Sequence, residues 1–220
     1  MKYTLLALAA IFVLASCKKK KEDTPEFDKG ELLENVADNL ILPSLNTFSD
    51  DLATLKASFD AFENDQTQAN LDIVRDNWKT AYLSWQSTKI YDFGPQLDNG
   101  VKGAIGIFPS DTTQIKNNIT NGGYNLASVA NTDAIGLSAL DYLLYKSNAL
   151  DEFVNTTNYS NYASDVIQKM IDEIATVQAG WTGYKSTFIA STGTETTSSF
   201  TALVNEFNKD YEIAKNAKLG

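Results

Sequence analysis

Apolar residues recur at steps of three and four along most of the chain, which is the spacing of one face of an α-helix. The pattern predicts helices over residues 28–41, 43–62, 67–91 and 159–189, and from residue 200 onward. Five apolar stripes carry these predictions: Leu32, Leu33, Val36, Leu40 and Ile41; Leu45, Phe48, Leu52, Leu55, Phe59 and Phe62; Leu71, Val74, Trp78, Tyr82 and Trp85; Val166, Met170, Ile174, Val177, Trp181, Tyr184 and Phe188; and Phe200, Leu203, Phe207, Tyr211 and Ala214. No segment alternates convincingly at period two, so we expect an all-α fold, an antiparallel helical bundle.

Proline and glycine interrupt two of these stripes. Pro43 predicts a kink or a short break at Leu42–Pro43, because the residue before a proline is pushed out of the α region. Gly180 and Gly183 weaken the middle of the 159–189 helix and predict a bend there. The bundle is therefore expected to contain irregular points within its long helices.

Residues 92–132 form an irregular segment that is rich in Gly, Asn, Asp and Thr. Within it, Ser110 and Asp111 are expected to cap a short helix over residues 112–119. The apolar run Ile105–Pro109 is expected to pack against the bundle. A loop region of this length is commonly functional or mobile.

A short apolar helix is predicted over residues 133–146, and it carries the best single candidate for a functional residue. Its leucines fall on one arc, and Ser138, Asp141, Tyr142 and Tyr145 fall on the opposite arc. Because two tyrosines stand where a surface helix would carry Lys and Glu, the second face is expected to be partly covered too. A carboxylate on a covered face needs partners, which singles out Asp141.

The first residues have the features of a targeting signal. Residues 1–16 have a positive start and a short apolar run that ends in Leu-Ala-Ser-Cys17, which predicts a secretory signal. The position of Cys17 resembles the bacterial lipobox, in which the cysteine is acylated; the alternative is a buried free thiol. Residues 17–28 then form a charged tether, and residues 29–220 form the folded domain. We expect a bacterial envelope protein, an outer-membrane lipoprotein that faces the periplasm or the cell surface.

Charge and composition exclude several classes of function. The formal net charge is −10, which makes nucleic acid an unsuitable partner. The chain has no histidine and one cysteine. Catalysis by histidine, imidazole metal ligands, cysteine-rich metal sites and intramolecular disulfides are therefore excluded.

Four segments, in this order, resemble the imelysin family, which is also known as peptidase M75. They are Asn39-Leu-Ile-Leu-Pro43, Trp78 with Trp85-Gln86, Phe93-Gly94-Pro95, and Gly136 to Leu144. The last segment is similar to the family motif Gly-x-His-x-x-Glu-Tyr-Leu-Leu, but Ser138 replaces the histidine and Asp141 replaces the glutamate. The resemblance implies an imelysin-like helical bundle that lacks part of the second half, since family members continue past the point where this chain stops.

The resemblance implies a non-catalytic binding lipoprotein linked to iron or haem acquisition, with the membrane and an iron- or haem-uptake receptor as partners. A ligand site at Gly136, Ser138 and Asp141 would use Asp141 as an oxygen ligand for a metal ion such as iron. Further oxygens could come from Asp92, Asp98 or Asp111, because hard cations need several. Two alternatives stay open: a metallopeptidase of the imelysin type, and a glycan- or protein-binding surface module. The Ser138/Asp141 pair could also be a buried hydrogen-bonded pair without a ligand.

Overall fold

The computed structural model describes residues 27–218 of the chain. The predicted signal segment 1–16, the acylated Cys17 and most of the charged tether lie outside the described residues. The helices in chain order are α2 (Lys29–Val36), the π-helical turn η1 (Ala37–Ile41), α3 (Leu42–Asn64), α4 (Gln68–Thr88), α5 (Pro95–Asp98), α6 (Val101–Gly106), α7 (Thr112–Asn121), the 3-10 turn η2 (Val129–Asn131), α8 (Gly136–Tyr145), α9 (Ala149–Asn155), α10 (Thr157–Ala190), α11 (Ser199–Ile213) and the π-helical turn η3 (Ala214–Lys218).

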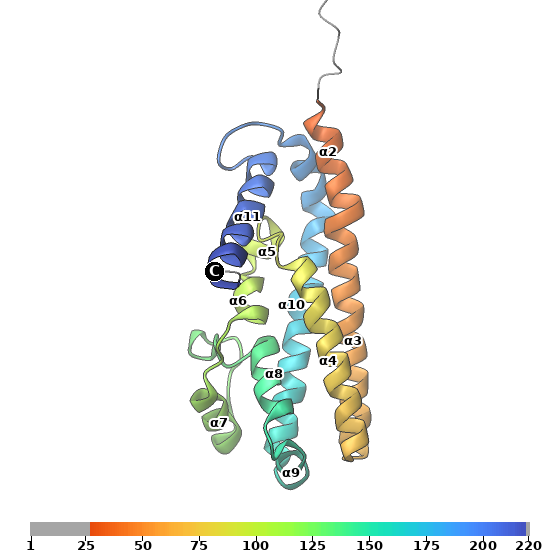
Figure 1. The fold of residues 1–220 in the computed structure, drawn as a ribbon, viewed down its shortest axis with the longest axis vertical. Helices are drawn as coiled ribbons and strands as arrows, with labels where there is room; N and C mark the ends of the chain where they lie inside the picture. The colour runs from red at the N-terminus through yellow and green to blue at the C-terminus, as the bar shows by residue number, and fades with distance from the viewer. Residues whose placement is uncertain (1–26, 219–220) are drawn as a thin grey trace, which may run out of the picture.

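Four helices, α3, α4, α8 and α10, form an antiparallel bundle (Figure 1). The helix α3 packs most extensively against α4 and α10, and α8 packs against α4 and α10. The shorter helices α5, α6 and α7 lie along one side of this bundle, and α11 runs beside α5 and α6 (Figure 1). The described residues contain helices and connecting segments and no strand, so the predicted all-α bundle is confirmed.

The apolar stripes on α3 and α10 form the core. Every stripe residue of α3 is fully buried, and on α10 only Tyr184 stays partly exposed. Two aromatic clusters mark the ends of this core. Phe59, Phe62, Phe153 and Tyr159 meet at one end, and Phe93, Trp181, Tyr184 and Phe188 meet toward the other.

The pattern predicted a kink or a short break at Leu42–Pro43, but the chain does not break there. It continues as a helix, and the irregularity is the π-helical turn η1, one turn before the proline. At the end of this turn the Leu42 N–H donates to the Ala37 carbonyl, five residues back. The wider turn places Pro43 in the first turn of α3, where the missing N–H of proline costs little.

The helix α10 is a single element of 34 residues, so the glycines do not end it. A Cβ at Gly180 would lie 3.0 Å from the Cβ of Pro95. Glycine at this position therefore lets the start of α5 pack closely against α10, and close packing is the reason for Gly180.

Five apolar positions were expected in the core and lie at the surface. Leu40 in η1 and Tyr82 on α4 are 46% and 43% exposed. Phe108 in the run after α6 is 83% exposed, and Phe207 and Tyr211 on α11 are 45% and 64% exposed. The helix α11 buries Leu203 and half-buries Phe200, but it lies at the edge of the bundle with few neighbouring helices. Its stripe is therefore only half covered.

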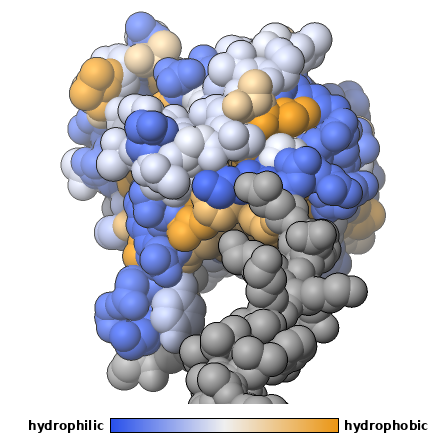
Figure 2. Space-filling model, turned by 90° about the horizontal axis from the view of Figure 1, so that it is seen from above, coloured by the Kyte–Doolittle hydropathy of each residue, from blue (hydrophilic) through white to orange (hydrophobic). Residues whose placement is uncertain are grey.

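The end of the molecule at which α2 begins is mainly hydrophilic, with small hydrophobic patches between the polar side chains (Figure 2). Phe27 contributes to this end and packs edge-on against Phe200, with the ring centroids 6.4 Å apart. Across residues 27–218, no helix has both the length and the apolar character needed to cross a membrane.

Candidate functional site

The motif helix α8 begins with a glycine that no other residue could replace without strain. Gly136 has φ +78°, and a Cβ there would lie 2.5 Å from the carbonyl oxygen of Ile105. The preceding residue, Ile135, is extended and provides no side-chain cap for the helix. Gly136 therefore sets α8 directly against the end of α6 and leaves the first N–H groups of α8 without a side-chain partner.

The two faces of α8 are only partly as expected. Leu137, Leu140, Leu143 and Leu144 are buried, in agreement with the pattern. On the opposite face Ser138 and Tyr142 are half-buried, but Asp141 and Tyr145 are exposed. The expectation of a covered carboxylate was therefore wrong, because the neighbouring elements reach only part of this face.

Asp141 has no hydrogen bond or ion pair to any described residue, so it does not form a hydrogen-bonded pair with Ser138. Partial burial raises the pKa of its carboxyl group above the ordinary value. Ser138 makes its contact through the backbone: its carbonyl accepts a hydrogen bond from the Ser110 hydroxyl at 3.3 Å.

Three side-chain hydrogen bonds fix α8 to α4. The Trp78 indole donates to the Leu137 carbonyl at 3.0 Å, and Arg75 Nε donates to the Leu144 carbonyl at 2.9 Å. The Tyr145 hydroxyl donates to the Arg75 carbonyl at 3.0 Å. Arg75 also pairs with Asp72 at 2.8 Å, so the single arginine of the chain caps the C-terminal end of α8.

A cavity of about 530 Å³ opens at the start of α8, between α4, α6 and α11. We call it the motif pocket. Its lining combines aromatic and apolar side chains with two lysines, and consists of Tyr82, Trp85, Gln86, Lys89, Lys102, Gly106, Phe108, Leu137, Ser138, Asp210 and Ile213. Ser138 of the sequence-predicted site lines this pocket, whereas Gly136 and Asp141 do not.

Ion pairs connect the pocket wall to α11. Lys102 Nζ lies 3.4 Å from Asp210 and 3.8 Å from Asp92, and Lys209 Nζ lies 3.7 Å from Asp92. Asp92 is nearly buried, whereas the lysines are partly exposed, so added salt can still screen these pairs. The uncapped start of α8 adds a partial positive charge to the same cavity.

The remaining acidic candidates do not gather around Asp141. Asp92 pairs with lysines, and Asp111 caps α7 by accepting from the N–H groups of Thr113 and Gln114, as the sequence predicted. Asp98 lies exposed on α5. In the part of the chain that the structure describes, no three acidic or cysteine side chains are grouped so that they could hold a metal ion.

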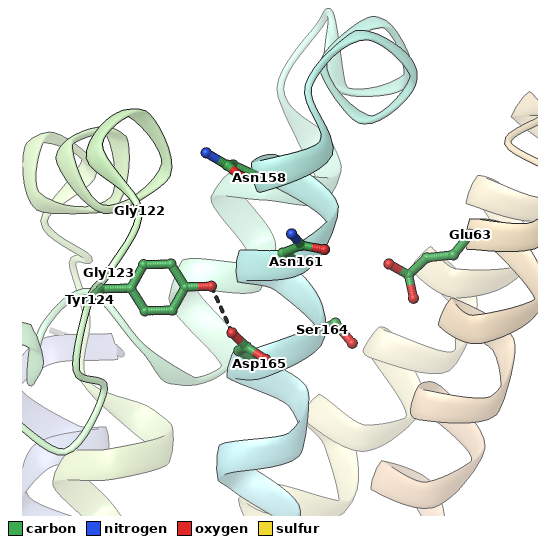
Figure 3. A pocket seen from close by; sticks show the side chains of 8 residues that line it. All are labelled: Glu63, Gly122, Gly123, Tyr124, Asn158, Asn161, Ser164 and Asp165. Carbon is green, nitrogen blue, oxygen red and sulfur yellow. Dashed lines mark hydrogen bonds between the residues drawn. The ribbon is translucent and has the colours of Figure 1, made fainter.

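A second concavity crosses the first half of α10, and Figure 3 shows it at close range. We call it the α10 groove. Its volume is about 510 Å³, and its lining is Glu63, Gly122, Gly123, Tyr124, Asn158, Asn161, Ser164 and Asp165. The Tyr124 hydroxyl donates to the Asp165 carboxylate at 2.7 Å. Burial raises the pKa of Glu63, and repulsion from Asp60 raises it further.

Apart from Ser138, the sequence did not indicate the residues of either concavity as candidate site residues, although Trp85 and Gln86 belong to a segment that resembles the family. The signal for the α10 groove was present in polar residues at steps of three and four on the solvent side of α10, but such a stripe is equally typical of a plain surface. The pocket residues of α11, Asp210 and Ile213, follow the end of the motif helix at Tyr145 by 65 and 68 residues and could be placed only by the fold.

The chain is similar to known proteins in both sequence and structure. The family model described as imelysin, peptidase M75, matches residues 41–220. Iron-regulated protein A from Synechococcus elongatus is 26% identical over 86 residues, which are 39% of this chain and 24% of that protein.

Two crystal structures share the fold. A candidate iron-regulated protein A precursor from Parabacteroides distasonis superposes with a TM-score of 0.68 at 15% identity, over 82% of this chain and 54% of that one. An imelysin-like protein from Psychrobacter arcticum gives 0.70 at 15% identity, over 86% and 61%. The chain thus spans little more than half the length of these solved relatives, and about a quarter of the curated relative.

Proposed function

This chain belongs to the imelysin family, and we propose that it is a non-catalytic binding protein of the bacterial envelope that serves iron acquisition. Its ligand in this proposal is an anionic iron chelate, held in the motif pocket. Two relatives named for iron regulation support the link to iron. Anchoring through an acylated Cys17 and delivery to an outer-membrane uptake receptor complete the proposal.

The composition of the motif pocket is the observation that carries the proposal. Tyr82 and Phe108 offer exposed ring surface, and Lys89 brings positive charge to a chain whose formal net charge is −10, whereas the charge of Lys102 is already paired with Asp210 of the same lining. The uncapped first turn of α8 adds N–H donors beside Ser138. Rings together with cationic groups suit a ligand that has both an apolar body and carboxylates.

In this proposal the iron is already coordinated by a chelator when it binds to the protein. A bare iron ion needs several ligands from the protein, and the described residues bring no three acidic or cysteine side chains together. A porphyrin or a hydroxycarboxylate supplies its own iron ligands and leaves the protein to recognise its negative charge. The Ser138 and Asp141 replacements of the family motif agree with a site that recognises a chelate instead of ligating a metal.

Calorimetric titration of the purified protein with haemin and, separately, with ferric citrate tests this function. Lys89→Gln removes one positive charge from the pocket, and Lys79→Gln removes an exposed positive charge from α4, outside the pocket, as a control. We expect Lys89→Gln to weaken binding by about tenfold or more, as for the loss of one charged hydrogen bond, and Lys79→Gln to leave it unchanged. Binding of neither probe, or equal loss in both variants, would contradict the proposal.

Two further measurements address the anchor and the alternative activity. Labelling of growing cells with a palmitate analogue should mark the wild-type protein and not Cys17→Ser. Digestion of casein should be absent with and without a chelator, because a metallopeptidase needs a set of protein ligands and a general base. Chelator-sensitive cleavage by the purified protein would replace the binding proposal with the peptidase alternative.

A further inference from the structure

The α10 groove is separate from the motif pocket, with which it shares no lining residue. One wall is the segment Gly122–Tyr124, the floor is α10, and Glu63 at the end of α3 forms the other side (Figure 3). Gly122 and Gly123 both have φ +63°, a left-handed conformation that carries the chain to Tyr124. The segment thus places the Tyr124 ring against the floor of the groove.

Every side chain in the groove can form hydrogen bonds, and no aliphatic side chain lines it. Tyr124 is committed to Asp165, and the Asn158 amide donates to the Ile119 carbonyl at 3.0 Å. The side chains of Glu63, Asn161 and Ser164 have no hydrogen bond to any described residue. In Figure 3, Asn161 and Ser164 project from α10 on the side that faces Glu63. A carboxylate, an amide and a hydroxyl therefore face one open space with unused hydrogen-bonding capacity.

We propose that the α10 groove binds a neutral oligosaccharide. Neighbouring hydroxyl groups of a sugar each donate and accept, and a carboxylate paired with an amide matches them with acceptors and a donor. The half-buried Tyr124 ring adds an aromatic surface with a polar edge. The volume of about 510 Å³, with a lining that reaches across α10 from Tyr124 to Glu63, suits a chain of sugar units and not a single compact ion.

Other ligand classes fit the same groove less well. Anions are repelled, because Glu63 and Asp165 are the charged side chains of the lining. A peptide draws most of its affinity from apolar anchors in pockets, and this lining has no apolar pocket to receive one. A metal cation lacks a group of three acidic or cysteine ligands here, as elsewhere among the described residues.

The test is calorimetric titration of the full chain with a panel of neutral hexasaccharides: the β-1,4- and β-1,3-glucans, α-1,4-glucan, xylan and mannan series. Asn161→Ala and Ser164→Ala remove exposed or half-exposed groove side chains, and Asn117→Ala removes an exposed amide on α7 outside the groove. We expect millimolar or tighter binding of at least one hexasaccharide. That binding should weaken by about fivefold or more in each groove variant and stay unchanged in Asn117→Ala.

Three results would overturn the proposal. One is no heat from any hexasaccharide up to about 10 mM, which lies beyond the range of weak specific binding. Another is equal binding by the groove variants and Asn117→Ala. The third is heat from calcium chloride that disappears in Glu63→Gln while no sugar binds, which would assign the groove to a cation. None of these results depends on whether haemin binds in the motif pocket, so the two proposals are tested independently.

Discussion

At the scale of single residues, Gly136 carries the clearest structural requirement in the motif. A side chain at this position would destabilise the fold for two reasons. The backbone is left-handed, with φ +78°, and a Cβ would lie 2.5 Å from the Ile105 carbonyl oxygen. We expect Gly136→Ala to lower the free energy of unfolding by about 2–4 kcal/mol, the backbone cost plus the cost of overpacking. Chemical denaturation followed by circular dichroism measures the difference.

Gly100→Ala separates the two costs. Gly100 has φ +62°, but a Cβ there would meet nothing within 4 Å. Its replacement should cost only about 1 kcal/mol, the backbone part alone. If the two alanine variants were equally stable, the close approach of α8 to α6 would not be the reason for Gly136.

Asp141 gives a pH-dependent prediction. Its folded-state pKa is raised by partial burial, so the native protein favours the protonated carboxyl and stability falls as pH rises through the folded pKa. Asp141→Asn removes this cost. The variant should exceed the wild type in stability at pH 7 by up to about 0.5 kcal/mol, in view of the exposure of the group, and the difference should vanish near pH 3.

Urea denaturation at a series of pH values checks this, with Asp151→Asn as a control for an exposed acidic residue. A wild type more stable than Asp141→Asn at pH 7 would mean that the carboxylate has a stabilising partner in solution. Such a partner would revive the hypothesis that Asp141 ligates a cation.

The sequence predicted which residues of the motif helix are buried, but it misplaced the carboxylate. The leucine arc follows from helical geometry alone and is confirmed by the buried leucines. Whether the opposite face is covered depends on where α4, α6 and α7 pass, and tyrosines occur on exposed as well as buried faces. Asp141 therefore could not be placed from its own neighbours in the chain.

At the scale of elements, α11 is attached to the molecule by both charge and apolar contact. Lys102 pairs with Asp210, Lys209 pairs with Asp92, and the apolar contribution is small, with Leu203 as its only buried core side chain. Salt near 1 M shortens the screening length to about 3 Å and weakens such pairs. We expect the α11 amides to exchange with deuterium several-fold faster in 1 M sodium chloride than in dilute buffer.

Two controls make this prediction specific. The α10 amides, whose helix lies in the core, should show little salt dependence. In Lys102→Met the α11 amides should exchange faster at low salt and respond less to added salt. Exchange from α11 that is independent of salt in the wild type would show that the apolar contacts alone hold the helix.

The long helices were predictable because a three-four stripe over five or more turns has few other interpretations. The ends of elements were less predictable. The proline at 43 suggested a break, whereas a π-helical turn absorbs the change and keeps the rod continuous. The stripe of α11 was predicted to be core because periodicity identifies a face of a helix but not what covers it, and Phe207 and Tyr211 are 45% and 64% exposed.

At the scale of the whole molecule, the family and the bundle could be recognised from the sequence, but neither concavity could. Each concavity is made by segments far apart in the chain: 82–108, 137–138 and 210–213 for the motif pocket, and 63, 122–124 and 158–165 for the α10 groove. Their positions depend on how the irregular segment 92–132 folds back on the bundle. Local patterns contain no information about such packing.

The helix α10 makes the molecule one cooperative unit, because it contacts α2, α3 and α5 to α9 along its length. Damage at one end should therefore destabilise the other. Phe62 lies in the aromatic cluster with Phe59 and Phe153, whereas Trp85 and Trp181 lie in the part of the core nearer α5. Phe62→Ala leaves a cavity and should cost about 3–5 kcal/mol.

In denaturant, the tryptophan fluorescence and the helical circular dichroism of Phe62→Ala should shift to lower concentration together, in a single transition. The matched change at the other end, Phe188→Ala, should give the same coincidence, since Phe188 packs on Phe93 and Trp181. If Phe62→Ala lost helical signal while the fluorescence midpoint stayed in place, the two aromatic clusters would belong to separately unfolding parts. Coincidence is expected because a helix without tertiary contacts is only marginally stable in water, so the loss of packing at one end of the 34-residue α10 lowers the stability of the whole helix.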